Sequence, residues 1–389
     1  MSEVPRPSRE RLTELFLMLT RVSSPSRSER AVADVVRSCL ASCGVEIHED
    51  HTGDVIGGDC GNLWCVVRGE GSGPHLALGA HLDTVPATDS LEPVLDEAGV
   101  FRNSRPAILG ADDKAAIAAM LHATELLKAS GEPFPSYELL FTVSEETGLV
   151  GVKHLAEDVL ESPLAAVLDS SGPVGGVVVK APSMVNLRAT FRGRAAHAGV
   201  EPERGRSAVQ AAAKAIASMH LGRLDRETSA NVGVIHGGVA TNVVPDLCEI
   251  LGECRGHDED RLAAVSAEMV DAVQRAAVEA GVDVDVELVH EFHAFALSAR
   301  SPVVRLAKAA IVALGREPSM LTAGGGSDAN VLNGRGLPTI NLDTGMMRVH
   351  SPEEHLSLDQ LEQLCLLVLH LIRLAPDHIP RAGSVVGGL

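Results

Sequence analysis

The sequence predicts an α/β protein of two domains, in which the first domain is interrupted along the chain by the second. A chain of 389 residues is too long for one typical compact core. Short apolar runs alternate with amphipathic stretches at both ends of the chain, which is typical of a sheet flanked by helices. The pattern changes between these parts. We therefore expect a discontinuous domain of residues 1–182 and 297–389, and an inserted α+β domain of residues 183–296.

The expected strands of the first domain are short apolar runs: residues 63–67, 76–80, 137–143 and 164–168. Amphipathic helices are expected at residues 9–21 and 29–43. Residues 112–128 begin with acidic residues and end at Lys128, the order that a helix dipole favours, so a third helix is expected there. The α/β alternation returns in residues 302–314, 339–342 and 358–374.

The inserted domain has the pattern of an α+β unit. In chain order we expect a strand, a helix, two strands, a helix and a strand: residues 185–191, 207–219, 231–235, 247–252, 261–280 and 282–288.

Composition excludes several classes of partner. Hydrophobic residues make up 45% of the chain and charged residues 22%, as in globular proteins, but aromatic residues only 2%, so stacking platforms for nucleic acid are not expected. A net charge of −19 disfavours phosphate backbones and anionic lipid. No apolar stretch has the length of a signal peptide or membrane span. We expect a cytoplasmic protein with reduced cysteines and with neither a nucleic-acid nor a membrane partner.

The segment HLDTVP, residues 81–86, follows an apolar strand. Side chains two residues apart on a strand face the same side, so His81 could bind a metal ion while Asp83 orients its ring. Taken alone, this pair is more often a solvated feature of a strand end.

Four further segments place a histidine or carboxylate at a strand end or in a loop. Asp112 and Asp113 begin the expected helix, where helix capping is the alternative interpretation. The others are Glu145 and Glu146 after an apolar strand, Asp169 after another, and His350 in the segment RVHSPE. Together with His81 they indicate a metal cluster. A set of histidines and carboxylates without cysteine suits Zn²⁺ with water still bound, or Mn²⁺ or Co²⁺.

At this point the sequence resembles the M20 metallopeptidase family, and within it the peptidase T-like proteins. The resemblance covers nearly the whole chain and depends on these segments: HLDTVP, GADDK, SEETG, the strand ending at Asp169, RAAHAG, GGVATNVVPD, GGGSDAN and RVHSPEEHLSL. It implies a mixed α/β zinc-peptidase catalytic domain with an inserted lid and dimerisation domain, and a homodimer.

The resemblance also implies roles for the cluster. Asp112 would bridge two divalent cations, most simply Zn²⁺, with Co²⁺ or Mn²⁺ as alternatives. His81 and Asp169 would bind one ion, and Glu146 and His350 the other. Glu145 would be the general base, Asp83 would orient His81, and a strained peptide bond before Asp113 would aim Asp112.

In the inserted domain, the resemblance implies that His197 stabilises the oxyanion and that Asn242 and Arg255 contact the substrate, with Arg255 pairing with a carboxylate. A surface histidine and a surface salt bridge are the alternatives. The glycine run that includes Gly325 and Gly326 could cradle a substrate through backbone N–H groups, although a glycine-rich loop alone is weak evidence.

The leading hypothesis is a dinuclear, peptidase T-like tripeptide aminopeptidase that acts on short peptides. The alternative within the family is an N-acyl amino acid amidohydrolase or a carboxypeptidase. A non-catalytic metal-binding or peptide-binding protein is disfavoured, because every proposed ligand and the base are present.

Overall fold

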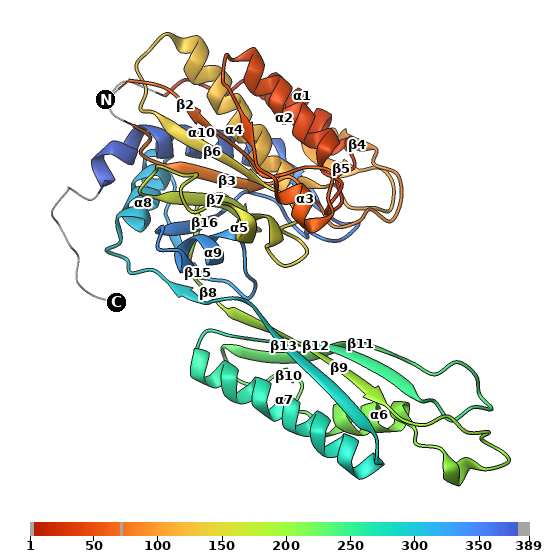
Figure 1. Ribbon diagram of the computed structural model, residues 1–389. Helices are drawn as coiled ribbons and strands as arrows, with labels where there is room; N and C mark the ends of the chain where they lie inside the picture. The colour runs from red at the N-terminus through yellow and green to blue at the C-terminus, as the bar shows by residue number, and fades with distance from the viewer. Residues whose placement is uncertain (1–3, 71–72, 380–389) are drawn as a thin grey trace. The chain divides into compact units, whose positions relative to one another are not determined.

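The computed structural model describes residues 4–70 and 73–379, which form two compact units (Figure 1). The first unit comprises Met1–Val179, Ala296–Thr322 and Ser327–Leu389, and the second comprises Lys180–Phe295 and Ala323–Gly326. The short segment Ala323–Gly326, which the expected division left in the first domain, belongs to the second unit. Its Ala323 N–H donates to the Lys180 carbonyl at 2.8 Å, and a side chain at Gly326 would lie 2.3 Å from the Phe292 ring.

The first unit is built on a mixed sheet with the strand order β1-β2-β6-β3-β7-β16-β8-β14, and β15 pairs with β8. The bounds of these strands are β1 (His48–Glu49), β2 (Leu63–Val67), β3 (Ala77–His81), β6 (Tyr137–Thr142), β7 (Ala165–Ser170), β8 (Gly176–Ala181), β14 (Phe295–Ala296), β15 (Ser319–Thr322) and β16 (Thr339–Asp343). Strand β3 is parallel to β6 and β7, and β16 is parallel to β7. Every residue of β3 and β6 is buried, as in parallel strands covered on both faces. The predicted α/β class is confirmed.

The helices of this unit pack against the sheet and against one another. They are α1 (Arg9–Thr20), α2 (Arg30–Ser42), α3 (Thr52–Ile56), α4 (Ala111–Ser130), α5 (Val150–His154), α8 (Pro302–Ala313), α9 (Asp328–Gly334), α10 (Leu358–Leu374) and the short η2 (Ala375–His378). Helix α4 contacts β3, α1 and α10 and is buried along most of its length. Within residues 4–70 and 73–379, no helix has the length and apolar character needed to cross a membrane.

A small separate sheet lies in the first unit, with the order β17-β5-β4. Its strands are β4 (Pro93–Leu95), β5 (Val100–Asn103) and β17 (His355–Ser357). Strand β17 follows the segment that contains His350, so its pairing with β5 fixes where that segment runs.

The second unit is an antiparallel sheet with helices on one face, ordered β10-β11-β12-β9-β13. Its elements are β9 (Ser183–Arg192), η1 (Pro202–Arg204), α6 (Ala208–Ser218), β10 (Gly222–Arg223), β11 (Thr228–Gly237), β12 (Leu247–Gly256), α7 (Glu259–Ala280) and β13 (Asp283–Phe292). Residues of β9 and β12 such as Leu187, Phe191 and Ile250 form a core with α6 and α7. The four long strands are longer than predicted, because backbone pairing continues past the apolar runs into polar and charged residues.

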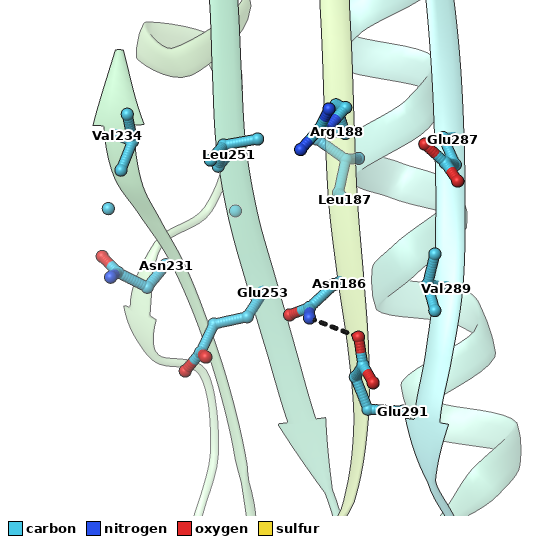
Figure 2. A pocket seen from close by; sticks show the side chains of 12 residues that line it. Asn186, Leu187, Arg188, Asn231, Val234, Leu251, Glu253, Glu287, Val289 and Glu291 are labelled. Carbon is cyan, nitrogen blue, oxygen red and sulfur yellow. Dashed lines mark hydrogen bonds between the residues drawn. The ribbon is translucent and has the colours of Figure 1, made fainter. Parts of the chain in front are cut away.

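The opposite face of this sheet is open and carries both apolar and charged side chains (Figure 2). A hollow of about 560 Å³ lies there, lined by residues that include Leu251, Val234 and Glu253. The Asn186 side-chain amide donates to Glu291 at 2.8 Å across it. None of the proposed metal ligands lines this hollow.

Candidate metal centre

The parallel strands of the first unit bring the expected metal ligands to one edge of the sheet. His81 is the last residue of β3, Asp169 is the penultimate residue of β7, and Glu145 and Glu146 lie in the turn after β6. Strands β6, β3 and β7 are neighbours and run in the same direction, so their carboxyl ends meet. Ligands of open α/β sheets gather at this edge.

His81 is held in the orientation that a metal ligand needs. Its Nδ1 lies 2.9 Å from the backbone carbonyl oxygen of Asp83. Because a carbonyl only accepts hydrogen bonds, Nδ1 carries the proton and the lone pair is on Nε2. Nε2 lies 3.0 Å from Asp112 Oδ1 and 3.5 Å from Asp169 Oδ1. The Asp83 carboxylate, which we expected to orient the ring, is farther away, with Oδ1 at 3.5 Å from Nδ1.

Asp112 lies between two histidines. Its Oδ1 faces His81, and its Oδ2 lies 3.2 Å from Nε2 of His350. His350 Nε2 also lies 2.8 Å from Oε1 of Glu146. The structure therefore brings the five expected ligands into two groups of three that share Asp112, and within each group the donor atoms lie within 4.8 Å of one another.

These donors fit divalent cations. Ligands about 2.1 Å from a tetrahedral Zn²⁺ are separated from one another by roughly 3.4 Å, close to the 3.0, 3.2 and 3.5 Å measured here. Glu146 Oε1 is buried and, in the part of the chain that is described, has no hydrogen bond of normal geometry, although His350 is close. Two ligand atoms that lie this close without a hydrogen bond between them, here Glu146 Oε1 and His350 Nε2, are well placed to bind the same ion.

The electrostatics of the cluster show an excess of negative charge. Burial, followed by the charges of Asp112 and Asp328, raises the pKa of Asp169 to about 7 even though His81 opposes the shift. Burial and then Asp169 raise the pKa of Glu145 well above its usual value. Bound cations would relieve this repulsion.

The two histidines show the complementary effect. Hydrogen bonding to Asp112 and Glu146 raises the pKa of His350 to about 10. Burial lowers the pKa of His81, but its carboxylate neighbours outweigh burial and raise that pKa well above the ordinary value. Both rings therefore lie in a field that favours positive charge, which a metal ion would supply.

The aspartates at the start of α4 do not cap the helix. Gly110 is the N-cap residue, and Asp112 and Asp113 have non-helical backbone angles. The peptide bond between them is cis. The Asp113 carboxylate accepts the His81 N–H at 3.3 Å, while that of Asp112 faces the two histidines. The capping alternative does not describe either side chain.

Sequence reasoning missed the role of Glu354. Its buried carboxylate accepts the backbone N–H groups of Leu109, Gly110 and Asp112 at 2.7, 2.8 and 3.1 Å. Glu354 thus holds the loop that presents Asp112. The residue lies in the quoted segment RVHSPEEH, but a bond from a side chain to a distant backbone leaves no periodicity in the sequence.

Asp328 was also missed. Asp328 is the first residue of α9 and lies between Ser327 and Asn330, the two residues of the capping box at the start of this helix. The capping box is a signal that the sequence contains. Asp328 Oδ2 accepts the Thr142 hydroxyl at 2.5 Å, and its buried Oδ1 has no hydrogen-bond partner among the residues described. Burial raises the pKa of Asp328 to about 6.

The expected substrate residues lie in the second unit and fall into two groups. His197 and Asn242 are exposed on adjacent loops, where the Ala198 N–H donates to the Asn242 carbonyl at 2.9 Å. The Gly199 N–H donates to His197 Nδ1 at 3.1 Å.

Arg255 and Gly325 form the other group. Arg255 makes a two-point salt bridge to Glu253, at 2.9 and 3.0 Å, as the alternative interpretation expected. A Cβ at Gly325 would lie 3.7 Å from its guanidinium, whereas Gly326 packs on Phe292. Strand β12 separates the groups, and at about 3.3 Å per residue its ends from Leu247 to Arg255 lie roughly 26 Å apart.

A cluster of histidines and carboxylates at the carboxyl edge of an α/β sheet is the kind of site that metal-dependent hydrolases have. The comparison with known families agrees: residues 77–374 match the model of peptidase family M20/M25/M40. The chain belongs to this family and is a metallopeptidase of the peptidase T-like kind.

Similar proteins span nearly the whole chain. The uncharacterized protein YqjE of Bacillus subtilis is 38% identical over 93% of this chain and 98% of its own length. The crystal structure of aminopeptidase PepT from Bacillus cereus is 38% identical, with a TM-score of 0.83 over 95% of this chain and 99% of that one. A tripeptidase from Staphylococcus aureus is 32% identical, with a TM-score of 0.89 over 96% of this chain and 100% of that one.

Proposed function

We propose that the protein is a tripeptide aminopeptidase that works with two divalent cations, with Zn²⁺ favoured and Co²⁺ or Mn²⁺ as alternatives. The observation that carries the proposal is the pair of donor groups that share Asp112. His81 and Asp169 would hold one ion, and Glu146 and His350 the other. The similarity to an aminopeptidase and a tripeptidase at 38% and 32% identity supports this reaction over other amide hydrolyses.

When bound, the two cations would polarise the scissile carbonyl and lower the pKa of the attacking water. Glu145 belongs to neither donor group, which leaves its carboxylate to accept a proton from that water and deliver it to the leaving nitrogen. Its position beside Glu146 in the turn after β6 keeps it next to the donors.

His197 would stabilise the oxyanion of the tetrahedral intermediate. Because the Gly199 N–H occupies Nδ1, the neutral ring carries its proton on Nε2, which is then the free donor. Asn242 would contact the substrate, and Arg255 would exchange Glu253 for a substrate carboxylate, with the backbone of Gly325 beside it. The substrates would be short cytoplasmic peptides.

The roughly 26 Å between the two ends of β12 supports a homodimer. Groups at opposite ends of one strand cannot both contact one short peptide from the same subunit. His197 and Asn242 would therefore serve the site of the neighbouring subunit.

The experiment is metal analysis with tripeptide hydrolysis, before and after chelation and after Zn²⁺ or Co²⁺ is added back. We expect about two ions per chain and chelator-sensitive release of the N-terminal residue. Cleavage of N-acetyl amino acids instead would favour the amidohydrolase, and bound metal without any cleavage would favour a non-catalytic metal-binding protein.

The Glu145→Ala variant tests the proton-transfer role. We expect turnover to disappear while the metal content is retained, because Glu145 is not a ligand. The matched variant is Glu146→Ala, which should lose metal as well as activity. Loss of metal from Glu145→Ala would show that Glu145 is itself a ligand.

A further inference from the structure

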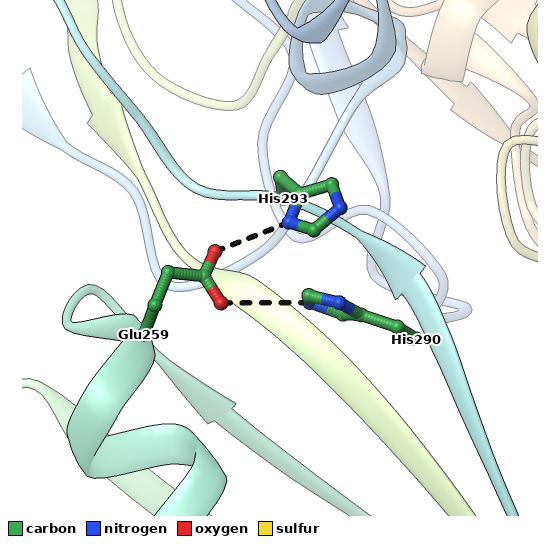
Figure 3. A group of neighbouring side chains, drawn as sticks. All are labelled: Glu259, His290 and His293. Atoms are coloured by element: carbon green, nitrogen blue, oxygen red, sulfur yellow. Dashed lines mark hydrogen bonds and ion pairs between the residues drawn. The ribbon is translucent and has the colours of Figure 1, made fainter.

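We propose that the second unit has a divalent-cation site of its own, formed by Glu259, His290 and His293, which binds a metal such as Zn²⁺ (Figure 3). Each residue offers one donor atom, and the three atoms lie within 4.8 Å of one another. All three residues belong to the second unit, and none is a ligand of the cluster in the first unit. The site goes beyond the proposed peptidase reaction and does not depend on it.

A β-bulge brings the two histidines to the same face. Side chains alternate along a strand, so residues three apart normally point to opposite faces of a sheet. The register of β13 against β9 shifts between His290 and Phe292, which inserts one additional residue. His293 therefore returns to the side of His290, and both rings point toward Glu259 on α7 (Figure 3).

The carboxylate of Glu259 is held in place before any metal binds. Glu259 is the first residue of α7, whose N-cap Asp258 accepts the Arg261 N–H at 2.8 Å. The Ser183 hydroxyl, at the start of β9, donates to Glu259 Oε1. Ser183 also accepts the Ala294 N–H at 2.5 Å, which ties the segment after β13 to the same point. Such bonds orient a ligand and limit the entropy lost on binding.

The separations match those of ligands around one ion. His293 Nδ1 lies 3.3 Å from Glu259 Oε1, and His290 Nε2 lies 3.7 Å from Oε2. Ligands of a tetrahedral Zn²⁺ are roughly 3.4 Å apart. The two imidazole rings meet edge to face, with centroids 4.0 Å apart and an interplanar angle of 72°. A water molecule would complete the coordination.

The chemistry of the donors selects the metal. Two imidazoles and one carboxylate suit Zn²⁺, Cu²⁺ or Ni²⁺, whereas Mg²⁺ and Ca²⁺ prefer oxygen ligands. A bound ion would join α7 to the end of β13.

The experiment measures Zn²⁺ bound per chain. Full-length protein, metal-loaded and desalted, is dialysed to equilibrium against increasing free Zn²⁺, and bound zinc is counted by mass spectrometry. The variants are His290→Ala with His293→Ala, and Glu259→Gln. The matched control is the His236→Ala variant. His236 is an exposed histidine of the same sheet and lies opposite Glu249 on the neighbouring strand, but it belongs to none of the candidate metal-binding groups found among the described residues. Circular dichroism checks that each variant is folded.

We expect wild type and His236→Ala to bind one Zn²⁺ per chain more than the double variant and Glu259→Gln. The difference between variants is the readout, so the result is independent of the number of ions in the first unit. Equal binding by all four proteins, or loss of the same ion from His236→Ala, would overturn the proposal. If the double variant does not fold, Glu259→Gln gives the answer, because its side chain keeps the shape of glutamate.

Discussion

The carboxylate of Asp83 holds the backbone of Glu145, with Oδ1 accepting the Glu145 N–H at 3.0 Å. Its Oδ2 accepts the N–H of Glu146 at 3.2 Å and the hydroxyl of Ser26 at 2.6 Å. The carbonyl of Asp83 accepts Nδ1–H of His81. One buried residue therefore connects the strand that ends in His81, a candidate metal ligand, to the turn that carries both glutamates.

This relationship predicts the effect of Asp83→Asn. Asparagine has only one acceptor oxygen, and its NH₂ group would face N–H or O–H groups that are themselves hydrogen-bond donors. Because two donors cannot bond each other, the turn after β6 should shift. We expect metal affinity to fall about 10-fold to 100-fold, as for other partners that orient metal ligands. A chelator competition titration measures the change. Asp89→Asn, an exposed aspartate farther along the same loop, is the control, and equal affinities in the two variants would contradict the prediction.

A second prediction concerns Glu354→Gln. The Glu354 carboxylate accepts three backbone N–H groups. In glutamine an NH₂ group replaces one of the two oxygens, so at least one of these N–H groups would lose its acceptor. An unsatisfied buried donor costs about 1–3 kcal/mol. We expect lower thermal stability and weaker metal binding together, since the displaced loop contains Asp112.

The neighbouring Glu353→Gln is the control for this variant. Glu353 is exposed, whereas Glu354 is 2% exposed. Melting temperature and metal content should be unchanged in Glu353→Gln. A Glu354→Gln protein with normal stability and full metal content would show that the hydrogen bonds do not hold Asp112.

The third prediction tests the homodimer and the role of His197. His197→Ala and Glu145→Ala should each be inactive as pure proteins. If His197 acts on the neighbouring subunit, refolding an equal mixture should restore about one quarter of wild-type activity, because half of the dimers are mixed and each has one complete site. No recovery in mixtures shown to contain mixed dimers would place His197 at its own subunit's site.

The fourth prediction is the acid sensitivity of stability through Glu49. Burial raises the pKa of Glu49, but the guanidinium groups of Arg30 and Arg37 and the N–H of Gly61 outweigh burial and lower it to about 2. In the unfolded chain the pKa of a glutamate is about 4.3. Because the pKa is lower in the folded protein, the ionised carboxylate stabilises the fold fully at pH values above about 4.3, and this stabilisation is lost as the pH falls toward about 2. We expect Glu49→Gln to lower the free energy of unfolding by roughly 1–2 kcal/mol at pH 7.

The pH dependence separates this effect from a loss of packing. The difference between wild type and Glu49→Gln should shrink progressively below about pH 4.3. Urea unfolding at several pH values measures it. The exposed Glu46→Gln is the control, and a difference that stays constant with pH would mean that charge is not the cause.

Much of the first unit was predictable because its strands are continuous apolar runs. The predicted strand at residues 63–67 coincides with β2, and the run at 137–143 ends one residue after β6. Likewise, residues 358–374 coincide with α10. Strands with one open, charged face were predicted too short, since residues such as Arg255 and Glu291 lie on that face and interrupt the apolar pattern.

The sequence alone marked His81, Asp112, Asp169, His350 and the pair Glu145 and Glu146 as a candidate cluster, because carboxylates and histidines at strand ends and in loops are a local signal. The resemblance to the M20 family then assigned Glu146 as a ligand and Glu145 as the base. The tertiary structure decided the grouping of the candidate ligands about Asp112, the carbonyl bond that fixes the His81 tautomer, the support from Glu354, and the place of Asp328 beside Thr142. It also decided the cluster of Glu259, His290 and His293, which needs a bulge and a helix start to meet. These contacts join residues that are far apart in the chain. A local sequence pattern does not show such contacts, because they form only when the whole chain folds.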